Sequence, residues 1–93
     1  MTKKEGAGMS KKRILLVDDE TDLVEMVKFR LEANDYEVLT AGDGQAALEI
    51  ARKERPDLII LDVMLPKMDG YKVCSLLKKD TRYANIPIMM FTA

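Results

Sequence analysis

The sequence has no histidine, no tryptophan and a single cysteine, Cys74, among its 93 residues. One cysteine excludes an internal disulfide and a multi-cysteine zinc site, and the lack of histidine excludes an imidazole metal ligand and a histidine base. No apolar run approaches membrane-spanning length, and residues 1–13 have no apolar core of a signal peptide. Carboxylate, hydroxyl and carbonyl oxygens are therefore the remaining candidates for metal binding and catalysis. We expect a cytoplasmic domain that makes no membrane contact.

Neither sign of charge dominates the sequence. The 15 basic and 16 acidic residues give a formal net charge of -1, so no overall field favours nucleic acid, and we expect no direct nucleic-acid binding. A chain of this length, 47% hydrophobic, buries one core, which predicts one domain. We expect residues 13–93 to form that domain and the lysine- and glycine-containing residues 1–12 to be a disordered, solvated tail.

Three aspartates directly follow two short aliphatic runs. Asp18 and Asp19 come after Ile14–Val17, and Asp62 comes after Leu58–Leu61. Short aliphatic runs bounded by breakers are typical of strands buried on both faces of a parallel sheet. Ligands of open α/β sheets bind beyond the carboxyl ends of the strands. The three acids therefore predict a site for a hard cation beside a reacting carboxylate.

Predicted strands and helices alternate along the chain, which favours a parallel sheet with right-handed crossovers. We expect strands over residues 14–17, 36–41, 58–61 and 86–91, the second of them near the sheet edge because it alternates only in part. Apolar periodicity predicts helices over about 20–33, from a cap at Asp43 to about Glu54, and after Gly70 with Val73, Leu76 and Leu77 facing inward.

Three segments resemble the receiver domain of bacterial two-component response regulators. They are Ile-Leu-Leu-Val-Asp-Asp-Glu (14–20), Arg-Pro-Asp-Leu-Ile-Ile-Leu-Asp-Val-Met-Leu-Pro-Lys-Met-Asp-Gly (55–70) and Ile-Pro-Ile-Met-Met-Phe-Thr-Ala (86–93). The middle segment is highly specific, because it combines the phosphoacceptor aspartate with the following proline and Asp-Gly. The resemblance implies a flavodoxin-like, doubly wound parallel α/β sheet with strand order 2-1-3-4.

The same resemblance implies a role for individual residues. Asp62 would accept a phosphoryl group from a sensor histidine kinase, and Thr92 would be the switch hydroxyl. Asp18 and Asp19 would form an acidic pair that binds Mg²⁺ or Mn²⁺ together with Asp62 and the backbone carbonyl of Met64. The chemistry agrees, because a carboxylate nucleophile needs a divalent ion to offset its repulsion from the phosphoryl oxygens.

Each of these signals has a simpler explanation. An Asp-Asp pair before a helix, taken alone, is more typical of a helix cap than of a metal site, and the sequence around Asp62 is what favours the metal site. Asp43 and Asp69 are typical of turns or caps. Thr92 alone is typical of an ordinary strand end.

The chain departs from the family pattern by ending at Ala93. The resemblance implies that the fifth strand, with its phosphate-pairing lysine, and the last two helices are missing, so we expect only weak phosphorylation. It also predicts an exposed edge strand over Ile86 to Phe91 and a homo-oligomer formed by edge pairing. An alternative hypothesis is a truncated receiver fragment that acts as an assembly unit without competent phospho-switching.

Overall fold

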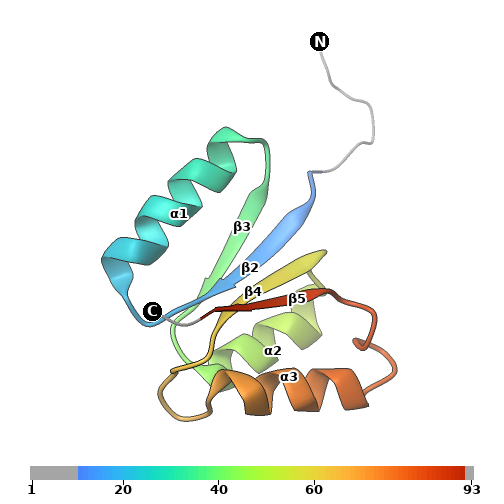
Figure 1. The fold of residues 1–93 in the computed structure, drawn as a ribbon. Helices are drawn as coiled ribbons and strands as arrows, with labels where there is room; N and C mark the ends of the chain where they lie inside the picture. The colour runs from blue at the N-terminus through green and yellow to red at the C-terminus, as the bar shows by residue number, and fades with distance from the viewer. Residues whose placement is uncertain (1–10, 92–93) are drawn as a thin grey trace.

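A computed structural model describes residues 11–91 and shows strands and helices in strict alternation (Figure 1). The strands are β2 (Arg13–Val17), β3 (Glu37–Ala41), β4 (Leu58–Asp62) and β5 (Ile88–Phe91). The helices are α1 (Thr21–Ala33), α2 (Gly44–Glu54) and α3 (Gly70–Lys79). No helix within residues 11–91 is long and apolar enough to cross a membrane.

The strands form one parallel sheet in the order β3-β2-β4-β5. Counted from the first described strand, this is the predicted order 2-1-3-4. It confirms the flavodoxin-like, doubly wound fold class. Strand β3 lies at one edge of the described sheet, as its incomplete alternation predicted. Register pairs Val17 of β2 with Leu61 of β4. The residues that follow these two strands therefore emerge at the same edge of the sheet.

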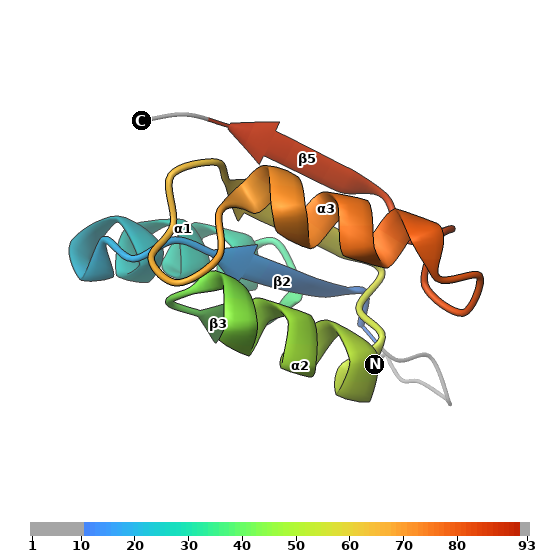
Figure 2. The same cartoon turned by 90° about the horizontal axis from the view of Figure 1, so that it is seen from below.

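Helices α2 and α3 cover one face of the sheet, and α1 lies on the other (Figure 2). The main core fills the space between the sheet and the α2–α3 layer. Its buried side chains are Leu15, Val17, Ala41, Ala47, Leu48, Ala51, Ile59, Leu61, Val73, Leu77 and Tyr83. Burying apolar area at this scale is the dominant stabilising contribution in a small domain. Val73 and Leu77 are buried as predicted, and Leu76 packs against the core while half-exposed.

The face of the sheet beside α1 is less well covered. No residue of α1 is fully buried. An open groove of about 420 Å³ runs along α1, lined by Leu16, Asp18, Leu23, Val24, Val27, Ile60, Met89 and Phe91. Leu16 and Ile60 line this groove, whereas their strand neighbours Leu15 and Ile59 join the main core. The two aliphatic runs thus supply apolar side chains to both faces, as strands of a buried parallel sheet do.

The last strand is shorter than predicted, because β5 begins at Ile88 rather than at Ile86. Proline has no N–H to donate to a sheet, so Pro87 contributes only its carbonyl, which accepts a hydrogen bond from the N–H of Ile59 at 3.0 Å. Ile86 belongs to the preceding turn, where its N–H donates to the carbonyl of Tyr83. The predicted edge strand therefore comprises Ile88–Phe91 in the described chain, and Thr92 lies outside the described residues.

Candidate functional site

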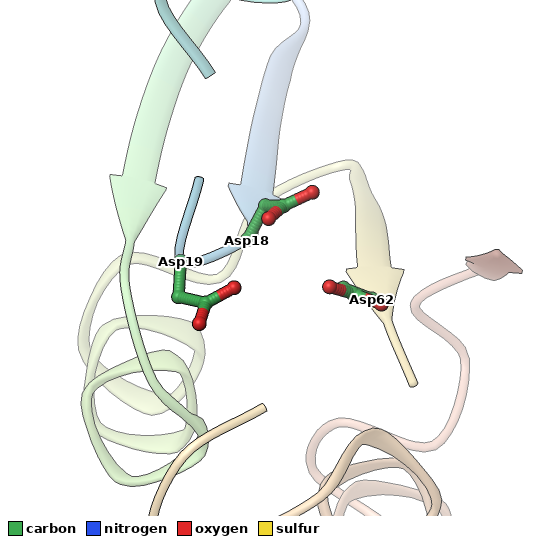
Figure 3. Close-up of side chains that lie close together, drawn as sticks. All are labelled: Asp18, Asp19 and Asp62. Carbon is green, nitrogen blue, oxygen red and sulfur yellow. The ribbon is translucent and has the colours of Figure 1, made fainter. Parts of the chain in front are cut away.

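The three aspartates predicted to form a site lie together at the carboxyl edge of the sheet. Asp18 follows β2, Asp62 ends β4, and the in-register pairing of these strands brings the two to the same level. One carboxylate oxygen from each of Asp18, Asp19 and Asp62 lies within 4.8 Å of the others, and Figure 3 shows the three side chains grouped around one space. The structure therefore brings together residues that are far apart in the sequence.

Burial distinguishes the two neighbouring acids. Asp18 is 4% exposed and Asp62 is 3% exposed, whereas Asp19 is exposed to solvent. The N–H of Asp18 donates to the carbonyl of Ala41 at 3.1 Å, so this residue continues the pairing of β2 with β3. Asp19 is released from that pairing and extends from the rim. The cluster consequently has two buried carboxylates, Asp18 and Asp62, and one at the surface, Asp19.

The carboxylate of Asp18 has one oxygen that is an unsatisfied hydrogen-bond acceptor. Its Oδ1 accepts a hydrogen bond from the N–H of Glu20 at 2.9 Å, but its Oδ2 is buried with no hydrogen-bond partner in the described chain. Among residues 11–91, no lysine or arginine forms an ion pair with any of the three acids. An unpaired buried charge is costly, so the arrangement favours a bound cation at Oδ2.

A helix cap does not account for these acids. Glu20 occupies the N-cap position of α1, with no side-chain hydrogen bond to the helix. Asp18 receives only the N–H of Glu20, which precedes the first turn. By contrast, Asp43 accepts from the N–H of Ala46 at 2.8 Å and Asp69 from that of Lys72 at 2.9 Å. Those two aspartates are caps, as the sequence predicted.

Asp62 is oriented by the backbone that follows it. Its Oδ1 accepts a hydrogen bond from the N–H of Met64 at 3.1 Å. The N–H of Val63 donates to the carbonyl of Phe91 at 3.0 Å, which extends the pairing of β4 with β5 past Asp62. The Met64 side chain is 72% exposed and takes no part in the core. These contacts hold the Met64 peptide beside Asp62, whereas its role as a carbonyl ligand stays a prediction.

Gly70 closes the loop of residues 63–69 back onto the site. Its N–H donates to the carbonyl of Val63 at 2.9 Å, and a Cβ atom at this position would lie 2.4 Å from the carbonyl oxygen of Asp62. Only glycine fits there without displacing the backbone of Asp62. The sequence marks Gly70 as a turn residue, and its packing against Asp62 is visible only in the fold.

The oxygen cluster matches the preferences of a small, hard cation. Mg²⁺ binds oxygens at about 2.0–2.1 Å, so two ligands on opposite sides of it lie about 4.2 Å apart. The 4.8 Å span of the cluster is wider than this by roughly 0.6 Å, so small rotations of the carboxylates would bring all three oxygens onto one ion that retains some of its waters. The donor set contains oxygen alone, which suits Mg²⁺ or Mn²⁺ better than softer metals. The residues present therefore fit the predicted metal.

Comparison with protein families and curated proteins identifies relatives of the chain. A family model described as the response regulator receiver domain matches residues 14–93. The alkaline phosphatase synthesis transcriptional regulatory protein PhoP of Bacillus subtilis is 50% identical over 82 residues, which cover 88% of this chain and 33% of that protein. A probable transcriptional regulator, ycf27, of Cyanophora paradoxa is 49% identical over 91% of this chain and 34% of its own length. The chain spans about a third of the length of these relatives.

Solved structures show the same likeness in three dimensions. The chemotaxis response regulator CheY4 of Vibrio cholerae is 38% identical, with a TM-score of 0.83 over 87% of this chain and 68% of that chain. A response regulator from Chloroflexus aurantiacus is 36% identical, with a TM-score of 0.84 over 87% of this chain and 66% of that chain. Sequence and fold therefore point to the same family.

Proposed function

The chain belongs to the response regulator receiver family, and from that membership we propose that it is a phosphoacceptor domain of two-component signal transduction. Asp62 takes a phosphoryl group from a sensor histidine kinase. Asp18, Asp19 and Asp62, with the backbone carbonyl of Met64, hold Mg²⁺ or Mn²⁺ beside it. The comparisons give no support to the alternative hypothesis of a purely structural assembly unit.

The observation that carries this proposal is the buried, unpartnered Oδ2 of Asp18 beside the buried carboxylate of Asp62. A fold that only needed stability would replace or pair such a charge, because removing both buried charge and partner is often neutral or stabilising. Carboxylates that are buried, clustered and unpaired are instead typical of a site that binds a cation. The acids therefore support a role in binding and chemistry.

The proposed reaction is transfer to an oxygen of Asp62. The hydrogen bond from Met64 N–H occupies Oδ1, which leaves Oδ2 as the attacking atom. An O–P bond forms at Oδ2 while the P–N bond to the imidazole of the donor breaks, and the electron pair of that bond returns to the imidazole nitrogen. A divalent ion at the site would supply positive charge against the phosphoryl oxygens.

We further propose that Thr92 supplies the switch hydroxyl. Support comes from its neighbour in the sequence, because Phe91 is paired in register with Asp62 across β4 and β5. Phe91 therefore ends β5 at the edge where the acids gather, and Thr92 is the next residue in the sequence. Such a hydroxyl would hydrogen-bond a phosphoryl oxygen on Asp62 and so couple phosphorylation to the conformation of the chain.

Intact-mass measurement after incubation with acetyl phosphate and MgCl₂ tests the assignment. We expect a small fraction of the wild-type chain to gain a single phosphoryl group, slowly, and Asp62→Asn to gain none. Asp57→Asn is the matched control, because Asp57 lies just before β4, at the opposite end from the site, where it accepts the N–H of Arg13. Labelling of Asp62→Asn at the wild-type rate would refute Asp62 as the acceptor.

A further inference from the structure

The loop of residues 63–69, which follows Asp62 and contains Met64, rests on the first turn of α2. The N–H of Gly44 points at the carbonyl oxygen of Pro66, at an N–O distance of 3.4 Å. The ammonium group of Lys67 lies 3.6 Å from a carboxylate oxygen of Asp43, the N-cap of α2. The loop therefore has a second support, in addition to its two ends at β4 and α3.

Gly44 makes the closest approach in this contact. A Cβ atom at position 44 would lie 2.0 Å from the carbonyl oxygen of Met68 and 2.7 Å from the Met68 Cβ atom. Nothing lies within 4 Å of a Cβ atom built at Gly42, two residues earlier. Glycine has a lower helix propensity than alanine, so Gly44 at the start of α2 reflects packing against the loop rather than helix propensity.

We propose that Gly44 is a positioning residue for the metal and phosphoryl site. By allowing residues 66–68 to pack directly on α2, it sets the path of the loop and hence the place of the Met64 peptide beside Asp62. This inference rests on the proposed function, because it assigns Gly44 a role in that same site. It extends the site to a residue that touches neither metal nor phosphoryl group.

The geometry transmits a change at Gly44 toward Asp62. The ends of the loop are held, at one side by the Met64 N–H bond to Asp62 and at the other by the Gly70 N–H bond to Val63. The carbonyl of Pro66 receives the N–H groups of both Gly44 and Met68. An added methyl group would lie 2.0 Å from the Met68 carbonyl oxygen, so restoring ordinary contact has to move the Met68 peptide by more than about 1 Å, and a displacement of about 1 Å can cost about 100-fold in a reacting site.

Manganese binding by wild type, Gly44→Ala and Gly42→Ala tests the role of Gly44. With Mn²⁺ as the titrant in calorimetry, we expect Gly44→Ala to raise the dissociation constant about tenfold or more, as loss of an outer support typically does. Gly42→Ala should stay within about twofold of wild type, and all three circular dichroism spectra should agree. Equal Mn²⁺ affinity in wild type and folded Gly44→Ala would overturn the role of Gly44 but leave the proposed metal site standing. A wild-type chain that binds no Mn²⁺ would overturn the proposed metal site and this inference with it.

A measurement on the wild-type chain decides the question even if Gly44→Ala does not fold. Coupling between two sites is reciprocal, so a support that tunes metal binding must itself be tightened by the metal. We expect saturating Mg²⁺ to slow hydrogen exchange of the Gly44 amide several-fold more than that of Asn34, whose N–H bonds to Leu31 at the far end of α1. Equal slowing of the two amides would overturn the inference.

Discussion

Replacing Asp18 with asparagine should stabilise the metal-free protein. The substitution removes a buried negative charge but keeps an oxygen for the N–H of Glu20. Two unit charges 4.8 Å apart, the widest separation within the cluster, repel by about 3.5 kcal/mol at an effective dielectric constant of about 20, and the NH₂ group that replaces the unpartnered Oδ2 can donate to a neighbouring carboxylate. Part of this cost is relieved by solvent at the exposed Asp19. We therefore expect Asp18→Asn to raise the free energy of unfolding by about 1–3 kcal/mol without metal.

Thermal unfolding in EDTA and in MgCl₂ measures both sides of this effect. For a domain of this size each kcal/mol shifts the melting temperature by about 4–8 °C, so Asp18→Asn should melt several degrees above wild type in EDTA. Ligand binding to the folded state adds RT ln(1 + [L]/Kd). Added Mg²⁺ should consequently raise the melting temperature of wild type and leave that of Asp18→Asn nearly unchanged.

The control for this prediction is Asp35→Asn. Asp35 is an exposed aspartate with φ 71°, a conformation that asparagine adopts readily. Surface changes of this kind alter stability by less than about 0.5 kcal/mol. A lower melting temperature for Asp18→Asn in EDTA, or an equal response of wild type and Asp18→Asn to Mg²⁺, would show that Asp18 does not belong to a metal site.

Two further predictions concern assembly and pH. In the described sheet β5 pairs only with β4, and Met89 is 57% exposed. We therefore expect dimers or larger oligomers to form through this edge, and we expect Met89→Lys to shift them toward monomer. Light scattering over a dilution series measures this, and a folded wild-type monomer at micromolar concentration would contradict it. Hydrogen bonds from Arg82 lower the pKa of Asp80 to about 2, from an ordinary value of 3.8. Because the pKa of Asp80 is lower in the folded state, its pairing with Arg82 stabilises the fold fully above about pH 4, and this stabilisation is lost as the pH falls toward 2. Urea unfolding should therefore show Asp80→Asn less stable than wild type at pH 7 and equal to it near pH 2.

The strand and helix order could be predicted because each element carries its own local pattern. The runs ending at Val17 and Leu61 are too short for buried helices and are bounded by polar residues, so they are predicted to be strands. Capping chemistry is equally local, and Asp43 and Asp69 cap their helices as predicted. The start of the last strand was less predictable, because Pro87 removes a donor while its carbonyl still pairs with Ile59.

The sequence by itself determined that three aspartates follow two buried strands, and parallel pairing of such strands is enough to place the acids at one edge. Only the tertiary structure decided that Asp18 is buried and lacks a partner while its neighbour Asp19 is exposed, because this depends on what packs around the rim. It also decided that Gly44 meets Met68, two residues brought together by the packing of α2 against the loop that follows β4. Local propensity reports the conformation of a segment, whereas burial and close contact depend on segments distant in the sequence.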